Sequence, residues 1–498
     1  MKKNVFTKVV VLLIEALCVA AGLEAQTAIP FPKLEADSQA YTYAQMEPVD
    51  GYSWQQLVEL SLWASGAGAS APGSRQPSFA GILREAVEEL RMSPGLPLYP
   101  QEKGAYVLAF MHKKFLKSYS ERQTRIDTIL SAGTYNCVSS AVLYMIFAVS
   151  IGLDVQGVMT RDHAFVTINT GSLSIDVETT NPYGFDPGNR REFHDNFGAL
   201  TGFVYVPARN YRDRTSISQL ELVSLILTNR ISSLEARNRF NEAVPLALNR
   251  VALLSQRRNP VASPLFPDPQ KDLTAHLRNF GTSLANAGKE QDALRWALLV
   301  ETRYPDEDWQ DFIYTLMNNL LVKLLQAQQV SEAWNLLNAN ASRLSPGNVT
   351  TFSLMILDTE LVQRTAGIRT TSDVEAVLAI LSDAKTVSIL PAGRTMELRT
   401  FVLLKGGELL AAEEGWFAAI NFIETAITRY GSNVQLESRL QAFRTNRVAQ
   451  LHNAFVNLFN RRNYEGAHQF ILEALEEFPG NRHLATDLEL VEKVIKKK

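Results

Sequence analysis

The stretch GTYNCVSSA (Gly133–Ala141) is followed at once by the apolar run VLYMIFAV (Val142–Val149). Together they predict a helix that begins near Cys137, is apolar on nearly every side and stops at Gly152. A helix of that kind is buried in a core rather than laid on a surface. Cys137, one of only two cysteines in 498 residues, therefore stands at the N-terminus of a buried helix.

The first residues have the order of a secretory signal peptide. Met1–Lys3 is basic, an apolar stretch runs over Val9–Leu23, and the small residue Ala25 follows. This order indicates a signal peptide over residues 1–25, too short and wrongly flanked for a stable membrane span. Glu15 interrupts the apolar stretch, so a buried N-terminal helix is the alternative.

Cleavage of this signal would leave a mature chain in the periplasm or outside the cell. That chain has no second stretch of ~18 apolar residues, so we expect no membrane span in it. Without cleavage, the segment would anchor the chain to the membrane. Cleavage also removes Cys18, and Cys137 can then form no internal disulfide. Because an unpaired thiol is a liability in an oxidising compartment, Cys137 is a candidate nucleophile; a small buried apolar residue is the competing interpretation.

The composition is that of an ordinary globular chain, 46% apolar and 20% charged. With 49 basic and 52 acidic residues the net charge is −3, so there is no basic excess for nucleic acid. One cysteine with scattered histidines offers no ligand spacing for zinc, and no glycine-rich loop is present to cradle a phosphate. We therefore expect no metal, no cofactor and no nucleic-acid partner.

After Gly152 the pattern changes from helical to alternating. Three short segments predict strands: DVQGVMT (Asp154–Thr160), HAFVTI (His163–Ile168) and LSIDVET (Leu173–Thr179). The residues Asn169–Ser172 between the last two predict a hairpin turn.

A two-residue turn at Thr170-Gly171 would place His163 opposite Glu178, with Asp176 diagonal on the same face. Cross-strand neighbours at ~5 Å, or diagonal ones at ~7–8 Å, can reach an imidazole. A helix N-terminus and a nearby imidazolium both favour a thiolate, and a catalytic imidazole needs an acceptor on its second nitrogen. Cys137, His163 and an acid can therefore form one site, with Glu178 favoured and Asp176 as the alternative.

Two other ionisable residues, His194 and Asp162, lie near these motifs in the sequence. His194 in EFHDNF is a rival base, although nothing around it matches. Asp162 precedes His163 and points to the other face of a strand, where we expect it to be solvated.

These motifs resemble the core of the bacterial transglutaminase-like superfamily, cysteine enzymes related in fold to papain-like proteases. In that family a cysteine opens a buried helix, His-Ala-aromatic follows on one strand, and Asp-x-Thr on the next. Here Cys137, His163-Ala164-Phe165 and Glu178-Thr179-Thr180 match in order, with glutamate in place of aspartate. The resemblance covers about Lys103–Gly188. If Asp176 is the family's acid instead, the register is shifted by two.

The resemblance implies acyl transfer from an amide, with Cys137 as nucleophile and His163 as base. The backbone N–H of Cys137 is the expected oxyanion donor. Water as acceptor would make the protein a peptidase or amidase acting on a peptide or isopeptide bond, which is our expectation. An amine acceptor would make it a crosslinking acyltransferase. A protein-binding scaffold without catalysis is the opposing class.

From about Thr215 onward the sequence predicts helices. A recurring unit of two helices joined by a short turn holds an alanine in six segments, at intervals of 50, 40, 43, 43 and 48 residues: Ala243, Ala293, Ala333, Ala376, Ala419 and Ala467. These units resemble tetratricopeptide helical pairs, although that family repeats every 34 residues.

We thus expect four parts in the chain. They are a signal peptide (1–25), a tether (26–40), an α+β transglutaminase-like/papain-like cysteine domain (41–214) and an all-α, TPR-like repeat domain (215–498). Arrays of helical pairs present an extended face to other chains. We therefore expect the repeats to bind a protein partner while the cysteine domain acts on a protein or peptide substrate.

Overall fold

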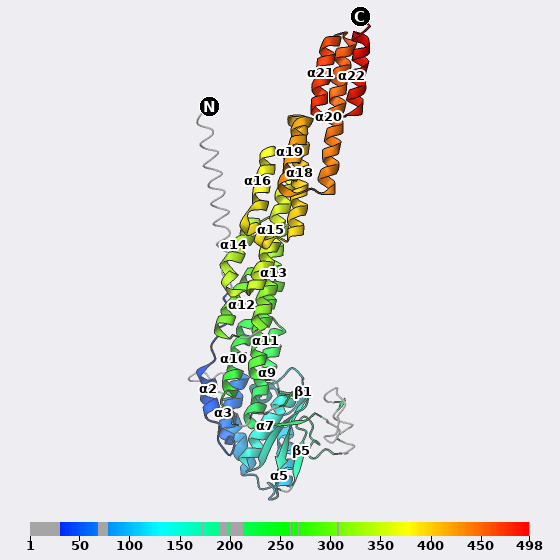
Figure 1. The fold of residues 1–498 in the computed structure, drawn as a ribbon. Helices are drawn as coiled ribbons and strands as arrows, with labels where there is room; N and C mark the ends of the chain where they lie inside the picture. The colour runs from blue at the N-terminus through cyan, green and yellow to red at the C-terminus, as the bar shows by residue number, and fades with distance from the viewer. Residues whose placement is uncertain are drawn as a thin grey trace, which may run out of the picture. The chain divides into compact units, whose positions relative to one another are not determined.

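The structure, a computed structural model, consists of two compact units, Met1–Phe312 and Ile313–Lys498 (Figure 1). The predicted signal peptide, Cys18 and His194 lie outside the residues that the structure describes. Those residues are 30–67, 78–171, 173–188, 193, 198–199, 213–258, 260–261, 263–266, 268–305 and 308–497.

The predicted buried helix is α7 (Cys137–Ser150), and every residue from Val138 to Ala148 in it is buried. Its N-terminus is closed by a capping box. The Asn136 side chain accepts from the Ser139 N–H, and the Ser139 hydroxyl accepts from the Asn136 N–H, both at 2.9 Å. Such a reciprocal pair satisfies backbone donors that a helix start otherwise leaves without partners. The helix is thereby fixed to begin at Cys137.

Helices of the first unit surround α7. Those before it in the chain are α2 (Ser38–Gln45), α3 (Trp54–Ser65), α4 (Phe79–Arg91), α5 (Pro100–Lys114) and α6 (Ile126–Ala132). Of these, α3 to α6 pack directly on α7.

A small sheet covers another side of α7 (Figure 1). Its strands run antiparallel in the order β5-β4-β3-β6, and their bounds are β3 (Asp154–Met159), β4 (Ala164–Asn169), β5 (Ser174–Val177) and β6 (Thr215–Ile217). Two further short strands, β1 (Ser118–Tyr119) and β2 (Thr134–Tyr135), pair in parallel.

The register of the β4–β5 hairpin differs from the one we predicted. Asn169 pairs with Ser174, and the Thr170 N–H donates to the Leu173 carbonyl at 2.9 Å, so the hairpin turns one residue later than we predicted. Gly171 in this loop has φ +83°, which suits glycine. Alternation of apolar residues fixes which face is buried, and a shift by two leaves that face unchanged. The pattern therefore could not distinguish the two registers.

The first unit extends well beyond residue 214, where we expected the cysteine domain to end. Strand β6 pairs with β3, and α9 (Gln219–Glu235) packs on α3, α7 and β3. Because α9 completes the core around α7, its residues from Leu220 to Leu227 are all buried. The boundary between the compact units lies instead inside α13 (Asp308–Gln326).

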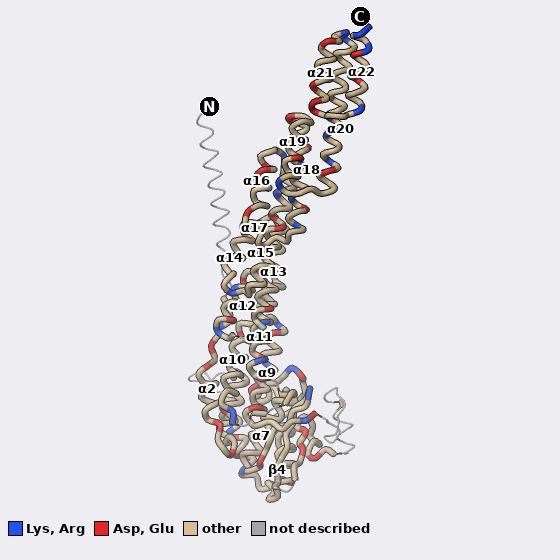
Figure 2. The backbone as a smooth tube through the Cα atoms, viewed as in Figure 1, with Lys and Arg blue, Asp and Glu red and all other residues tan. Residues whose placement is uncertain are grey.

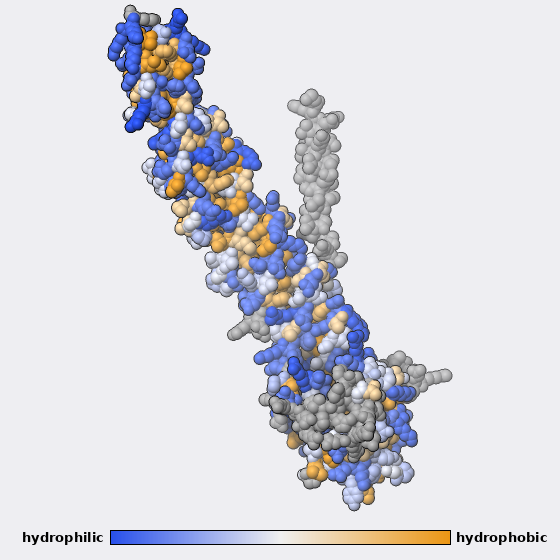
Figure 3. Space-filling view, turned by 90° about the vertical axis from the view of Figure 1, so that its right-hand side faces the viewer, coloured by the Kyte–Doolittle hydropathy of each residue, from blue (hydrophilic) through white to orange (hydrophobic). Residues whose placement is uncertain are grey.

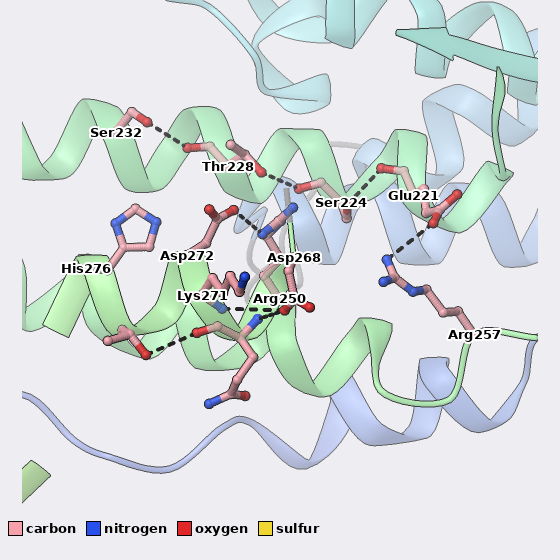
Figure 4. Close-up of polar contacts among 12 residues, drawn as sticks. Glu221, Ser224, Thr228, Ser232, Arg250, Arg257, Asp268, Lys271, Asp272 and His276 are labelled. Carbon is pink, nitrogen blue, oxygen red and sulfur yellow. Dashed lines mark hydrogen bonds and ion pairs between the residues drawn. The ribbon is translucent and has the colours of Figure 1, made fainter. Parts of the chain in front are cut away.

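The helices after α9 are α10 (Phe240–Leu254), α11 (Pro269–Asn286) and α12 (Glu290–Arg303). Ion pairs link α9 to the segment after α10, and α10 to α11 (Figure 4). The Glu221 carboxylate, almost fully buried at the start of α9, accepts from Arg257 at 3.2 Å. Arg250 of α10 bonds Asp272 of α11 at 2.8 Å. Buried charges are stable only when paired, so these pairs hold the three helices in one arrangement.

The described part of the predicted tether, 26–40, is packed rather than extended. The Phe31 ring meets Trp296 edge-on at 5.3 Å between ring centroids. The Asp37 N–H donates to the Asn249 side chain at 2.7 Å. This segment therefore binds along the helices that follow α9, and α2 begins at Ser38.

The second unit is helical throughout its described residues. After α13 its helices are α14 (Val330–Asn340), α15 (Pro346–Ala366), α16 (Thr371–Ser382), α17 (Ala384–Ile389), α18 (Ala392–Glu413), α19 (Trp416–Tyr430), α20 (Val434–Asn460), α21 (Tyr464–Glu477) and α22 (Arg482–Ile495). A single 3-10 turn, η2 (Ala341–Arg343), follows α14.

Most of the alanines in the predicted units hold the same place in their helices. Five of the six alanines are the fourth residue of a helix and are fully buried: Ala243 in α10, Ala293 in α12, Ala333 in α14, Ala419 in α19 and Ala467 in α21. Ala376 is the exception, because it is the sixth residue of α16 and is exposed. The chain is thus an α+β part followed by helices, and these helices begin within the first unit. No helix in the described ranges is long and apolar enough to cross a membrane.

Candidate active site

Cys137 is the first residue of α7, and its thiol is free and partly exposed. The N-terminus of a helix carries partial positive charge from backbone N–H groups that have no partner inside the helix. An anion at this position is stabilised by that charge. A partly exposed thiol here can react with a molecule from solvent, which a fully buried cysteine cannot.

His163 lies directly before β4, in a turn closed by the Thr160 N–H donating to the His163 carbonyl at 2.9 Å. Its Nε2 is 2.6 Å from Oε2 of Glu178. The imidazole also shares a hydrogen bond with the side chain of Cys137. Because Nε2 is engaged by Glu178, Nδ1 is the nitrogen left for the thiol.

Burial of the imidazole lowers the pKa of His163, but the charges and hydrogen bonds of Glu178 and Cys137 outweigh it. The charge of Glu178 and the hydrogen bonds to Cys137 and Glu178 raise that pKa well above 6.5. The surroundings therefore favour the imidazolium form beside the thiol. This arrangement of thiol, imidazolium and carboxylate is the one that activates a cysteine for nucleophilic attack.

Glu178 is buried, only 2% exposed, and both oxygens of its carboxylate accept hydrogen bonds. Its Oε1 accepts from the Thr180 hydroxyl at 2.7 Å and from the Thr180 N–H at 3.3 Å. The chain then folds back, and Gly184 comes so close that an added Cβ would lie 1.9 Å from the Glu178 carbonyl oxygen. Only glycine fits there. The loop after β5 thus fixes the acid that contacts His163.

The two threonines after Glu178 are in turn bonded to three other elements. His112 of α5 bonds the Thr179 carbonyl through Nε2 at 3.1 Å, and Ser140 of α7 bonds the Thr179 hydroxyl at 2.8 Å. The Tyr135 hydroxyl of β2 donates to the Thr180 carbonyl at 3.0 Å. Burial lowers the pKa of His112 to about 4, although the Thr179 bond opposes this. His112 is therefore neutral near pH 7 and donates Nε2–H.

Asp176, the alternative acid, is engaged elsewhere. Its two oxygens bond the Arg214 guanidinium at 2.8 and 2.9 Å, and one also accepts from Thr167 at 3.1 Å. In the observed register the residue opposite His163 would be Thr180, so Glu178 reaches the imidazole as a diagonal neighbour. The structure therefore brings Cys137, His163 and Glu178 together and leaves Asp176 apart from them.

One residue of the site was missed in the sequence. Burial raises the pKa of the Tyr119 hydroxyl in β1, and the charges of Cys137, Glu121 and Glu178 raise it further, so this hydroxyl interacts electrostatically with the site. The hydroxyl stays protonated and can donate a hydrogen bond in the site. A strand of two residues has no periodic pattern, so only the pairing of β1 with β2 could have revealed it.

Other groups considered in the sequence lie away from this arrangement. Asp162 is exposed, as predicted. Among the described residues, no group of three or more His, Cys, Asp or Glu side chains is placed to hold a metal ion.

Searches of protein-family models, curated proteins and solved structures found no match to this chain. The resemblance to transglutaminase-like enzymes therefore stays a prediction from the three sequence motifs.

Proposed function

We propose that the first unit is a transglutaminase-like cysteine hydrolase that cleaves a peptide or isopeptide amide. The observation that carries the proposal is the continuous set of hydrogen bonds from Cys137 to His163 to Glu178, at the N-terminus of a buried helix. A thiol, a base and an orienting acid in that order are the parts that nucleophilic amide cleavage requires.

In the proposed first step the Cys137 thiolate attacks the carbonyl carbon of the amide. The tetrahedral intermediate places its negative oxygen at the N-terminus of α7, where the Cys137 N–H is the proposed donor. His163 then gives its proton to the leaving nitrogen, the C–N bond breaks, and a thioester remains on Cys137. Glu178 keeps the imidazole oriented and stabilises its charged form.

In the second step His163, now neutral, removes a proton from water as the water attacks the thioester carbon. The C–S bond breaks, the carboxylic acid leaves, and the thiolate–imidazolium pair is restored. An amine in place of water would give a crosslinking acyltransferase by the same steps. Hydrolysis is the proposal, and measuring acid against transamidated product distinguishes the two.

The helical pairs of the second unit are the proposed binding site for a protein partner. Large apolar side chains are exposed on α18 and α19, namely Met396, Phe401 and Phe417, at 60%, 52% and 51%. Figure 3 shows apolar residues among hydrophilic ones on the visible face of this unit. Export through the N-terminal signal peptide remains part of the proposal, and cell fractionation with and without residues 1–25 tests it.

The decisive experiment is the rate of Cys137 alkylation by iodoacetamide between pH 5 and 9. A thiolate–imidazolium pair should react nearly as fast at pH 6.5 as at pH 8.5, and His163→Ala should lose the reaction at the lower pH. The matched control is His276→Ala, which removes a histidine bonded to Glu235 at 2.9 Å far along the chain. A rate that rises only around pH ~8.5, as for an ordinary thiol, would refute the enzyme proposal.

A further inference from the structure

Arginines line a groove in the first unit, in two adjoining hollows of about 480 and 520 Å³. The hollows share Arg122, Asn229, Ser233 and Arg237, so they form one continuous groove. Its arginines are Arg122, Arg125, Arg230, Arg237 and Arg239, against Glu121 and Glu242 as the acidic residues of the described lining. Figure 2 shows basic positions beside α9, where the chain leaves β1.

Two of these guanidinium groups are already neutralised by neighbours. Arg125 bonds both oxygens of Asp127, and Arg239 bonds both oxygens of Glu242 at 2.7 Å each. In both pairs a guanidinium binds a carboxylate of the chain itself through two hydrogen bonds, the geometry that a guanidinium prefers.

The remaining charges are not balanced by the chain. Arg122 and Arg237 are exposed, and neither makes an ion pair with any described residue. Arg230 is fixed by a bond to the Ala64 carbonyl. Burial lowers the pKa of Arg230, and the positive charge of Arg125 lowers it further against the pull of nearby acids. A bound anion would relieve this crowding of positive charge.

The groove begins at the residues that cap the helix carrying Cys137. The Glu121 carbonyl accepts from the Asn136 amide at 3.1 Å, and the Gln123 carbonyl accepts from the Ser139 hydroxyl at 3.3 Å. Asn136 directly precedes Cys137, and Glu121 directly precedes Arg122. An extended chain covers ~10 Å in three residues, so a peptide held at Cys137 reaches the groove within a few residues of the cleaved bond.

We propose that this groove binds acidic side chains of the peptide substrate, to one side of the bond that is cleaved. The inference rests on the proposed hydrolase activity and adds a substrate class, peptides rich in Asp or Glu. Nucleic acid fits less well, because the described lining contains no aromatic side chain to stack bases. The groove's charge contrasts with a chain whose net charge is −3.

Binding can be measured without catalysis, using the full chain with Cys137→Ala. Fluorescence anisotropy compares a labelled Glu-rich decapeptide with its Gln-rich counterpart, each at low and high salt. We expect the Glu-rich peptide to bind at least ~10-fold more tightly at low salt, with the difference falling as salt screens exposed charges. The double variant Arg122→Gln/Arg237→Gln should weaken that binding roughly 5- to 10-fold, since exposed pairs contribute modestly.

The matched control is Arg461→Gln/Arg482→Gln, which removes two exposed arginines from the second unit and changes the net charge equally. It should leave binding unchanged. Equal weakening in both double variants, or no weakening in the groove variant, overturns the proposal. A single-stranded oligonucleotide that binds more tightly than the Glu-rich peptide, and is lost with Arg122 and Arg237, assigns the groove to nucleic acid instead.

The two proposals fail separately. If alkylation shows an unactivated thiol while the Glu-rich peptide still binds through the groove, the hydrolase is wrong and the binding site stands. If Cys137 is activated but Arg122→Gln/Arg237→Gln cleaves acidic and neutral peptides with unchanged KM, the groove has no part in substrate choice.

Discussion

Replacing Glu178 by glutamine removes one charge beside His163 while keeping the size and shape of the side chain. The carboxylate is 2% exposed and lies 2.6 Å from Nε2 of the imidazole. A hydrogen bond to a charged group contributes about 1.5–3 kcal/mol, which is a roughly 10- to 150-fold change in the balance between imidazolium and imidazole. We expect kcat to fall about 10²- to 10⁴-fold, the range for a misaligned acid–base group.

The pH dependence has a definite sign. The pKa of His163 is raised in the folded chain, so its contribution to stability is fully present below pH 6.5 and is lost as pH rises through the raised value. Glu178→Gln removes that contribution. The variant should therefore lose most stability relative to the parent near pH 6 and least in alkaline solution, as followed by thermal unfolding at each pH. Alkylation of Cys137 should fall at pH 6.5 and change little at pH 9.

Two controls accompany this substitution. Asp176→Asn removes a carboxylate paired with Arg214 rather than with His163, and it should leave kcat within about 3-fold. Glu235→Gln makes the same chemical change at the His276 pair. The reasoning is refuted if Asp176→Asn alone abolishes turnover, or if Glu178→Gln keeps the parent's pH profile.

Tyr119→Phe should lower kcat about 10-fold or more with little change in KM, if its hydroxyl donates to the developing oxyanion; an unchanged kcat removes Tyr119 from the mechanism. The free energy of unfolding should fall by up to about 3 kcal/mol as pH drops from 6.5 towards 4. Folding lowers the pKa of His112 to about 4, so in this pH range the unfolded chain binds a proton at His112 that the folded chain does not. His112→Gln, which can still donate to Thr179, should flatten that part of the curve in denaturant titrations, and an unaltered curve would contradict the assignment. A fragment starting at Thr215 should aggregate in light scattering, since α9 would lose the core that buries it; a monomeric, cooperatively melting fragment would show that α9 folds without α7.

The sequence predicted those features whose signal is local. Twelve apolar or small residues in a row after Cys137 leave no polar face, so the buried α7 followed directly. Glu178 was chosen correctly as the residue that contacts His163, but through a register wrong by two. Alternation repeats every two residues, and only the position of the turn, fixed by the Thr170–Leu173 bond, decides between the registers.

What the sequence could not show depends on contacts between distant segments. The partners of Thr179 and Thr180, the residues after Glu178, come from α5, β2 and α7, and no spacing along the chain predicts them. The extent of the first unit was mispredicted although a signal existed. The run LELVSLIL (Leu220–Leu227) is apolar at six of its eight positions, and these positions lie on every side of a helix, which indicates a buried helix rather than one face of a repeat. Reading α9 as a core helix would have moved the boundary.

The bonds around Thr179 and Thr180 have a use in recognising related chains. A search pattern made of a cysteine, a histidine and an acid is short and matches by chance. The contacts add a tyrosine two residues before Cys137, a serine three residues after it and a histidine on the helix upstream. A chain that keeps these partners together with Gly184 would retain the same support for the acid, even where overall identity has fallen too low to align.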